Sequence, residues 1–332
     1  MKHIFFFEPN VKIKEYIKKG YETVKNSDLG KYNNLEWIYF SSQLPKKYKN
    51  DIYNIQTKWI NGVIYDKPNI FDKNDLYRMM IGTDDKNYLI EQISFNNNQI
   101  DKSLNNFMKK NHLYIIKPIP GSGGIGVKVF NQKDKLKDYI RNFEIPNLKN
   151  RKLLKTTKIK KWVLQKYIEN PLLLGGKKFH IRVLFLNLTK NGRKSFYLFD
   201  KFFIYTAEKK YTNSTLNKNV HNTHISTNTE LKRAMAEYNK LDSKKREDIQ
   251  KQVIDICKDI KPHMNYKCYD QSENCYQFAG LDLMVTNDYQ VKLIEINERP
   301  GSKGPSSYPS FWKGLLNLTL YGKTKTKDYI KL

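Results

Sequence analysis

The chain of 332 residues is short of acidic side chains and of long apolar runs. Its 33 Asp and Glu stand against 60 Lys and Arg, and the net charge of +27 predicts attraction to a polyanion: nucleic acid, an anionic membrane or an acidic protein segment. A purely compositional origin stays open, because Lys-rich surfaces readily keep proteins in solution. No apolar run approaches the roughly 20 residues that cross a bilayer. The opening "MKHIFFFEPN" is too short for a secretory leader and indicates a strand.

Cysteine is also scarce. Cys257, Cys268 and Cys275 show no C-x-x-C spacing and form no framework of a secreted protein, which predicts a reducing compartment. A zinc site would need a fourth ligand, and the nearby His263 completes no standard zinc pattern. With 39% hydrophobic residues, we expect a soluble cytoplasmic protein of one elaborated domain or two to three subdomains around a real core. The sequence predicts no membrane contact and no particular oligomeric state.

Strands and hairpins dominate the predicted secondary structure. The turn Asn191-Gly192 lies between the apolar segments 177–188 and 195–205, which predicts a β-hairpin. Residues 278–301 predict two further strands joined at Asn287-Asp288. Shorter strands are expected in five apolar stretches: "HIFFF", "LEWIYF", "LYIIKPI", "GVKVF" and "WVLQKYI".

Helical periodicity appears in two places. Leu76 and Met80 lie one turn apart after a candidate N-cap at Asp72. Apolar residues also recur at helical spacing through 241–260, where Asp242 or Ser243 is the candidate N-cap. Residues 206–228 are polar and indicate a long loop. The sequence therefore predicts a mixed α+β chain with helices interspersed among antiparallel hairpins.

A glycine-rich segment, "YIIKPIPGSGGIGVKVF", spans residues 114–130 and contains G-x-G-x-x-G. A dinucleotide-binding fingerprint needs a helix after the glycines, but "GVKVF" alternates like a strand. A Walker loop needs Lys and Ser or Thr after Gly126, where Val127 stands. Two interpretations remain: a structural hairpin turn, or a hairpin loop whose backbone N–H groups close over phosphates. In the second, Lys117 would direct its charge at the same phosphates.

Oxygen ligands recur near the end of the chain, in "GLDLMV" and "KLIEIN". Glu295 and Asn297 share one face of a strand, and Asp282 can lie opposite them on the neighbouring strand. Two carboxylates and an amide oxygen suit Mg²⁺ bound to nucleotide phosphates. The alternative is that all three are ordinary polar residues of a half-exposed hairpin.

These motifs, in this order, resemble those of the tubulin–tyrosine ligase-like family of ATP-grasp ligases. The resemblance spans roughly 72–304 and is most specific in "QKYIENPLLLGGKKFHIR". It implies an α+β ATP-grasp fold, with the nucleotide held between two antiparallel β-sheets and with ATP and Mg²⁺ as cofactors. It also implies three parts: a small α/β N-terminal subdomain over 1–70, a central subdomain with the glycine loop over 71–160, and a C-terminal subdomain with the adenine hinge and the metal site over 161–332.

The resemblance also implies roles for single residues. The implied catalytic residues are cations near the transferred phosphate: Lys117, Lys178, Arg182 and Arg299. The implied ATP-binding residues are the phosphate lysines, the glycine loop, the adenine hinge and positions in "KKFHIR" and "HISTN": Lys73, Lys117, Gly121, Gly123, Gly124, Gly126, Gln165, Lys166, Tyr167, Ile168, Lys178, His180, Thr227 and Asn228. The implied metal ligands are Asp282, Glu295 and Asn297. Ile168 and Leu283 would sandwich the adenine.

The chain departs from the family pattern at three places. His180 stands where the family usually has an acid, and "DKFFIY" at 200–205 replaces "REG" followed two residues later by Arg. "HISTN" at 224–228 carries one more residue than the family's His-Leu-Thr-Asn. A changed acceptor, a changed donor and a weakened enzyme all remain open.

The activity that the resemblance implies is ATP-dependent ligation of a free amino acid to a carboxylate on an acidic protein tail, such as that of tubulin, through an acylphosphate. Glutamate is the first expected donor, with tyrosine and glycine as alternatives. The basic run 149–161 and the basic N-terminal region would contact the tail. Three other functions stay open: an ATP-grasp kinase of a polyanionic small molecule, a nucleic-acid-binding protein, and a degenerate relative that only binds tails.

Overall fold

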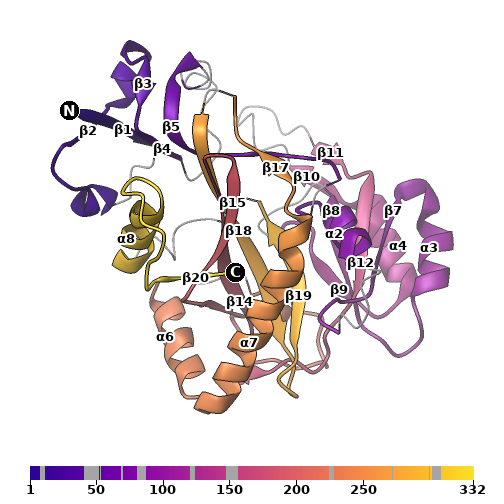
Figure 1. The fold of residues 1–332 in the computed structure, drawn as a ribbon. Coiled ribbons are helices and arrows are strands. Elements are labelled where there is room, and N and C mark those ends of the chain that lie inside the picture. Colours follow the sequence, from indigo (N-terminus) through magenta and orange to yellow (C-terminus); the bar gives the residue numbers. More distant parts are fainter. Residues whose placement is uncertain are drawn as a thin grey trace.

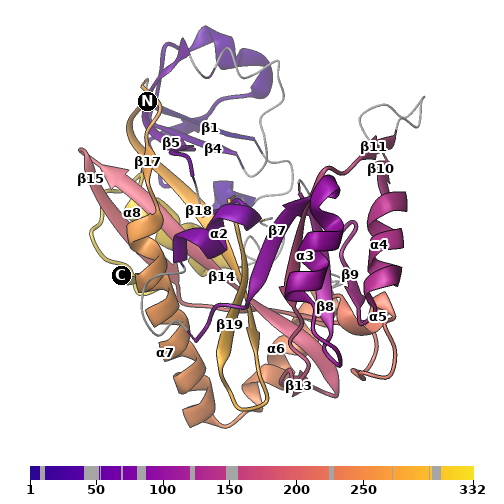
Figure 2. The ribbon, with the colours of Figure 1, turned by 90° about the vertical axis from the view of Figure 1, so that its right-hand side faces the viewer.

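Two larger β-sheets and two small ones make up the fold (Figures 1 and 2). The computed structural model describes residues 1–7, 12–40, 52, 54–68, 70–80, 87–119, 124–146, 156–223, 228–270, 272–298, 300 and 308–332. One larger sheet has 12 strands and the other has four. Two-stranded sheets pair β10 (Glu144–Pro146) with β11 (Thr156–Lys158), and β6 (Ile64–Tyr65) with β17 (Tyr266–Lys267).

The four-stranded sheet is antiparallel throughout. Its order is β7 (Gln92–Asn96), β12 (Lys161–Lys166), β8 (Tyr114–Ile119) and β9 (Lys128–Phe130). The helices α3 (Ile100–Phe107) and α4 (Lys133–Asn142) cover one face, where Trp162 and Leu164 pack with them. Because side chains alternate along a strand, Val163 and Gln165 point to the other face. The predicted antiparallel pairing of the strands around the glycine loop is confirmed.

The 12-stranded sheet has two long strands at its centre, β14 (Lys177–Lys190) and β18 (Ser272–Val285). Its main path runs β2-β1-β4-β5-β18-β14-β15-β20. The N-terminal strands pair in parallel, and β5 pairs in parallel with β18, so N-terminal and C-terminal segments share one sheet. The remaining strands of this sheet are β1 (Lys2–Phe7), β2 (Tyr21–Thr23), β3 (Asn34–Leu35), β4 (Trp37–Phe40), β5 (Gln56–Asn61), β13 (Leu173–Leu174), β15 (Arg193–Phe199), β16 (Phe203–Thr206), β19 (Val291–Asn297) and β20 (Tyr329–Lys331).

Helices cover both faces of this sheet. Ile249 and Val253 of α7 (Ser243–Ile260) and Tyr238 of α6 (Asn228–Asn239) belong to one core cluster, together with alternate residues of β14. Residues of α8 (Pro309–Leu318) belong to a second cluster, with the β14 residues that point the other way. The shorter helices are α2 (Lys73–Met80), α5 (Lys218–His221) and the 3-10 helices Lys12–Tyr16, Asn26–Lys31, Asn97–Gln99 and Lys261–His263.

Several sequence predictions are confirmed. Asn191 and Gly192 have φ of 50° and 72°, as a tight hairpin turn requires, and they join β14 to β15. The helix 241–260 exists as α7, and the side chain of Asp242 caps it by accepting a hydrogen bond from the Lys245 backbone N–H. The mixed α+β class is also confirmed.

Other predictions are wrong. The expected strand 195–205 is two strands, β15 and β16, which both run antiparallel to β14. The break falls at Asp200, whose backbone N–H bonds to the carbonyl of Asp328 instead of continuing the ladder with β14. Helices α3, α4, α5, α6 and α8 were not predicted, and α5 lies within residues 206–228, where the sequence predicted a long loop. Cys268 and Cys275 form a disulfide, whereas the sequence predicted a reducing compartment. Among the described helices, none has the length and apolarity that a bilayer span requires.

Candidate active site

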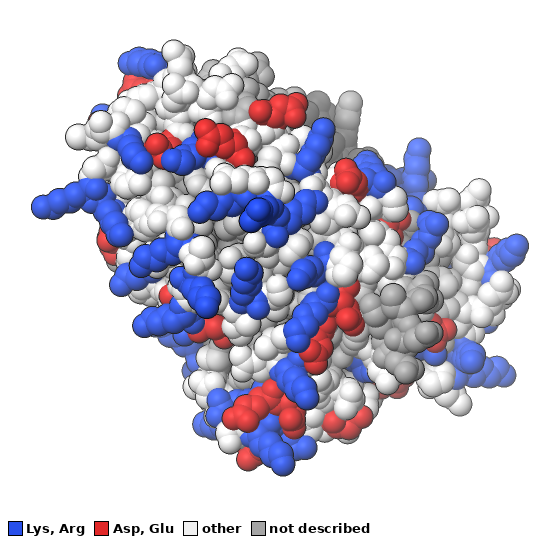
Figure 3. Space-filling view, viewed as in Figure 1, with Lys and Arg blue, Asp and Glu red and all other residues white. Residues whose placement is uncertain are grey.

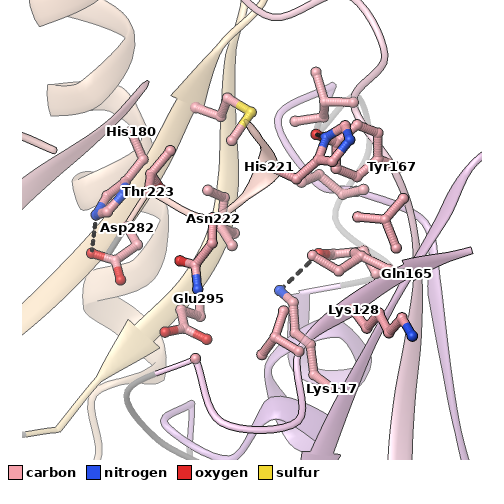
Figure 4. A pocket seen from close by; sticks show the side chains of 18 of the residues that line it. Lys117, Lys128, Gln165, Tyr167, His180, His221, Asn222, Thr223, Asp282 and Glu295 are labelled. Atoms are coloured by element: carbon pink, nitrogen blue, oxygen red, sulfur yellow. Dashed lines mark hydrogen bonds and ion pairs between the residues drawn. The ribbon is translucent and has the colours of Figure 1, made fainter. Parts of the chain in front are cut away.

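A cleft with a cavity of about 280 Å³ lies between the two larger sheets (Figure 4). Strands β8, β9 and β12 line one wall, β14, β18 and β19 line the other, and residues 216–223 add to the lining. Seven cations and two acids line the cleft: Lys73, Lys117, Lys128, Lys166, Lys178, Arg182, Lys218, Asp282 and Glu295. Such an excess of positive charge favours a polyanionic ligand.

Two lysines of this cleft are buried. Lys117, 5% exposed, donates a hydrogen bond of 2.9 Å to Oε1 of Gln165 (Figure 4). Lys178, 3% exposed, donates one of 2.6 Å to the Tyr167 hydroxyl. Burial lowers the pKa of Lys117 to about 8, and burial together with the charge of Lys117 lowers the pKa of Lys178 to about 7. A phosphate placed between these lysines would stabilise their charged forms.

The predicted metal ligands come together on the wall formed by β14, β18 and β19, which also carries Lys178. Asp282 on β18 pairs with Glu295 on β19, and Nδ2 of Asn297 lies 3.1 Å from Oδ2 of Asp282 and 3.4 Å from Oε1 of Glu295. A rotation of the Asn297 amide would turn its oxygen toward the same point. Three oxygen donors that meet in this way fit Mg²⁺, which commonly takes one or two carboxylates plus substrate phosphates. Among the described residues, no three His, Cys, Asp or Glu cluster in the way other metals would need.

Arg182 is firmly held by one of these carboxylates. Its Nε and Nη2 donate hydrogen bonds of 2.7 Å each to the two oxygens of Asp282. The Asp282 side chain is 3% exposed and that of Arg182 is 14% exposed. The bidentate pair fixes the guanidinium beside the candidate metal site.

His180 contacts Thr223 and lies close to Asp282. Its Nδ1 lies 2.6 Å from the Thr223 hydroxyl, and its Nε2 lies 3.8 Å from Oδ1 of Asp282 (Figure 4). Its ring stacks on Tyr205 at 5.0 Å between centroids, and the Arg182 guanidinium lies 5.3 Å from the Tyr205 ring. Two of the three departures from the family pattern, His180 and the segment that contains Tyr205, are therefore in direct contact.

Apolar side chains line another part of the cleft. Ile115, Val129, Ile168 and Met284 are among them, beside the predicted adenine hinge 165–168. The prediction that Leu283 would contact the adenine is wrong, because Leu283 is fully buried in the core. Its neighbour Met284 faces the cleft instead, as strand alternation requires.

Most of the predicted site residues line this one cleft: Lys73, Lys117, Gly124, Gln165, Lys166, Tyr167, Ile168, Lys178, His180, Arg182, Asp282, Glu295 and Asn297. Gly126 supports the loop from outside the lining. Its φ is +71°, and a Cβ there would meet the Phe143 ring at 2.6 Å. Gly121, Gly123, Thr227 and Arg299 lie outside the described residues, and Asn228 is described only as the first residue of α6.

Sequence reasoning missed several cleft residues. His221, Asn222 and Thr223 lie just before the "HISTN" motif, in a stretch predicted only as a polar loop. Lys128 and Lys218 were also missed. The one available signal was the dense polarity of residues 211–223 so close to a resembling motif.

Known proteins are similar to this chain in sequence and in fold. The family described as the Tubulin-tyrosine ligase family matches residues 41–321. A "Probable tubulin–tyrosine ligase" of Schizosaccharomyces pombe is 26% identical over 230 residues, 62% of this chain and 56% of that protein. "Tubulin glycylase 3B" of Tetrahymena thermophila is 28% identical over 219 residues, 59% of this chain and 17% of that protein. The chain thus spans about half, or less, of the length of these relatives.

A solved structure gives the fold. The C-terminal domain of K. lactis Pby1, described as an ATP-grasp enzyme interacting with the mRNA decapping enzyme Dcp2, superposes with a TM-score of 0.64 over 100% of this chain and 98% of that one, at 16% identity. The architecture is therefore the ATP-grasp fold. Because the family match covers most of the sequence, this chain belongs to the tubulin–tyrosine ligase family.

Proposed function

We propose that the protein is an ATP- and Mg²⁺-dependent ligase that joins a free amino acid to a carboxylate on an acidic protein tail such as that of tubulin. One observation carries the proposal: in an ATP-grasp fold of this family, buried Lys117 faces the cleft from one wall, and buried Lys178 faces it from the other wall together with Asp282, Glu295 and Asn297. Glutamate is the first donor to test. Tyrosine and glycine follow it, since the relatives' names include a tyrosine ligase and a glycylase.

The proposed reaction has two steps. A carboxylate oxygen of the acceptor attacks the γ-phosphorus of ATP, which breaks its bond to the bridging oxygen and releases ADP. The donor's amine nitrogen then attacks the carbonyl carbon of the acylphosphate. Phosphate leaves with the electron pair of the C–O bond, and the amine loses a proton as the amide forms.

Positioning and charge are the protein's contribution. Lys117 and Lys178 would bind phosphate oxygens and offset the repulsion between the acceptor carboxylate and the nucleotide. The hinge 165–168 would bind the adenine through its backbone, and Lys73 lies 3.6 Å from Glu295, next to the proposed phosphate position. Arg182, held by Asp282, would present its remaining N–H groups to the acyl phosphate. Arg299 keeps its proposed role in neutralising the transferred phosphoryl group.

Magnesium would be held by Asp282, Glu295 and Asn297, where it would neutralise phosphate charge and polarise the transferred group. The ion pair between Lys73 and Glu295 keeps a cation beside these carboxylates. Asp282 can accept hydrogen bonds from Arg182 and still offer lone pairs, because an ionised carboxylate has about four acceptor positions.

The surface charge supports an acidic acceptor. Lys and Arg side chains outnumber Asp and Glu over the face seen in Figure 3, in keeping with the net charge of +27. Attraction of this kind acts over about 10 Å at moderate salt and increases the rate of encounter. We propose that the acceptor binds partly through this field, so that added salt weakens turnover.

Intact-mass spectrometry tests the proposal. Tubulin would be incubated with the protein, Mg·ATP and an equal mixture of glutamate, glycine and tyrosine, beside a Glu295→Gln control. A mass increase of one amino acid that the variant cannot produce supports the ligase and identifies the donor. ATP-dependent phosphate transfer without an amino acid would instead favour the kinase. If the protein binds no ATP, but binds nucleic acid or acidic tails in a way that Glu295→Gln does not change, the ligase proposal fails.

A further inference from the structure

Three consecutive hydrogen bonds connect a lysine of the cleft to the polar segment 211–223. Nζ of Lys178, on β14, lies 2.6 Å from the Tyr167 hydroxyl, and that hydroxyl lies 2.6 Å from Nδ1 of His221. Nε2 of His221 lies 2.6 Å from the carbonyl oxygen of Thr215. Lys178, Tyr167 and His221 are all more than nine-tenths buried, and all line the cleft. These hydrogen bonds therefore connect β14, in one wall of the cleft, to the hinge and to α5.

Chemistry fixes the direction of each bond. A carbonyl oxygen can only accept, so Nε2 of His221 carries a proton and donates it to Thr215. Burial lowers the pKa of His221, which favours the neutral ring, so Nδ1 is an acceptor. The Tyr167 hydroxyl must then donate to Nδ1, and its oxygen is free to accept from Lys178. The roles of these groups agree with one another, and the Tyr211 hydroxyl is a further neighbour of the Tyr167 hydroxyl.

This arrangement constrains a side chain that is otherwise flexible. A lysine ammonium sits on a stem of four carbons and has three N–H donors. The bond to Tyr167 uses one donor, and the ammonium also lies 4.0 Å from the centroid of the Tyr167 ring. The two other donors of Lys178 can meet a ligand that enters the cleft.

We propose that Tyr167 and His221 are positioning residues, which hold the Lys178 ammonium in the orientation that binds nucleotide phosphates. The inference rests on the proposed function, because it takes Lys178 to be a phosphate-binding residue. Neither role follows from the resemblance, which placed Tyr167 in the adenine hinge and gave His221 no role.

The protonation of Lys178 gives a measurable sign of its hydrogen bond to Tyr167. Burial and the charge of Lys117 lower the pKa of Lys178 to about 7, so its charge in the empty cleft disappears as the pH rises past neutrality. The groups that face it are Tyr167, His221 and Lys117. Bound phosphate favours the charged form, so affinity should be constant below about pH 7 and should fall above it. Removing the Tyr167 hydroxyl takes away an acceptor of the ammonium and should shift this fall to lower pH.

Calorimetric titration with ATP between about pH 6 and about pH 9 tests this. Tyr167→Phe keeps the ring and the hinge backbone but lacks the hydroxyl, and we expect about tenfold weaker binding near neutral pH. Its fall in affinity should begin at lower pH than in the wild type. The matched control is Tyr266→Phe, which also removes a buried hydroxyl, bonded to Thr189 at the far end of β14, and should bind ATP like the wild type.

His221 is tested by a pair of variants. His221→Asn keeps an acceptor near the position of Nδ1, whereas His221→Leu has none, so Asn should retain more affinity than Leu. Wild-type affinity and pH profile in Tyr167→Phe would overturn the proposal. Equal loss in both His221 variants would remove His221 from it.

A measurement without nucleotide separates this inference from the proposed function. The ¹³Cε resonance of Lys178, assigned by its loss in Lys178→Arg, should titrate at lower pH in Tyr167→Phe than in the wild type. If the wild type binds no ATP, the proposed function fails while this titration still decides whether Tyr167 controls Lys178. An unchanged titration would reject the positioning role whatever ATP does.

Discussion

The ammonium of Lys117 and the side-chain amide of Gln165 lie 2.9 Å apart on neighbouring strands, with Lys117 as the donor. Two further hydrogen bonds continue from Gln165. Its Nε2 donates to Oε1 of Gln92 at 3.0 Å, and Nε2 of Gln92 donates to the carbonyl oxygen of Lys73 at 2.9 Å. Two amides therefore connect the buried lysine to the first residue of α2. That residue, Lys73, pairs with Glu295 across the cleft.

Gln92→Leu should weaken ATP binding although Gln92 does not line the cleft. The variant leaves Nε2 of Gln165 without its acceptor, so Gln165 can rotate and release Lys117. A lost hydrogen bond of this kind is worth about 1 kcal/mol, which is about fivefold in affinity. Equilibrium titration with ATP would measure it.

The control for this variant is Gln252→Leu. Gln252 also makes two hydrogen bonds, to the backbone of Tyr289 and Val291, but it lies on α7 away from the cleft. Equal ATP affinity in the wild type and in Gln92→Leu would show that the hydrogen bond between Gln92 and Gln165 does not help to position Lys117.

Asp282→Asn and Glu295→Gln should both abolish turnover, but they should differ in stability. Asp282 holds Arg182 through two short hydrogen bonds in a nearly buried pair, and breaking such a pair costs about 3–5 kcal/mol. Glu295 pairs with Lys73 at 3.6 Å in a more exposed setting, so its replacement should cost about 1 kcal/mol or less. Urea unfolding would compare them. The metal assignment fails if Glu295→Gln keeps Mg²⁺-dependent activity.

The sequence could predict the parts of the fold that depend on residues close together in the chain. The Asn191-Gly192 turn, the capped helix after Asp242 and the alternation of Glu295 with Asn297 each depend on neighbours in the chain, and all are present. The cleft follows from these patterns together with the family motifs, which fall on strands that face each other.

The rest depends on contacts between distant segments. Nothing near residues 195–205 indicates that the backbone N–H of Asp200 bonds to the carbonyl of Asp328, because Asp328 lies far along the chain. Gln92 and His221 could not be identified for the same reason. Gln92 meets Gln165 only when β7 pairs with β12, and His221 meets Tyr167 only when α5 packs beside the hinge. Leu283 was misplaced by one residue, which on a strand reverses the face.

A matched pair of glycine substitutions separates backbone strain from close packing. Gly126 and Gly192 both have positive φ, of +71° and +72°, so alanine strains both turns by about 1 kcal/mol. A Cβ at Gly192 has no atom within 4 Å, whereas at Gly126 it would meet Phe143 at 2.6 Å and Pro118 at 2.9 Å. Gly126→Ala should therefore lose more stability than Gly192→Ala, and it alone should weaken ATP binding. Equal losses in thermal unfolding would show that packing at the loop is not critical.

Lys178 should make the empty protein more stable as the pH rises. Its pKa is about 7 in the folded state and near the ordinary value of 10.5 in the unfolded chain, so between these values the unfolded state binds more protons. The free energy of unfolding of the wild type, minus that of Lys178→Met, should therefore increase with pH by up to about 1.4 kcal/mol per unit in this window. Urea unfolding at several pH values, without nucleotide, measures the difference. A difference that stays constant or decreases with pH would mean that burial does not lower the pKa of Lys178 in the folded state, and would weaken every role given to it at the phosphates.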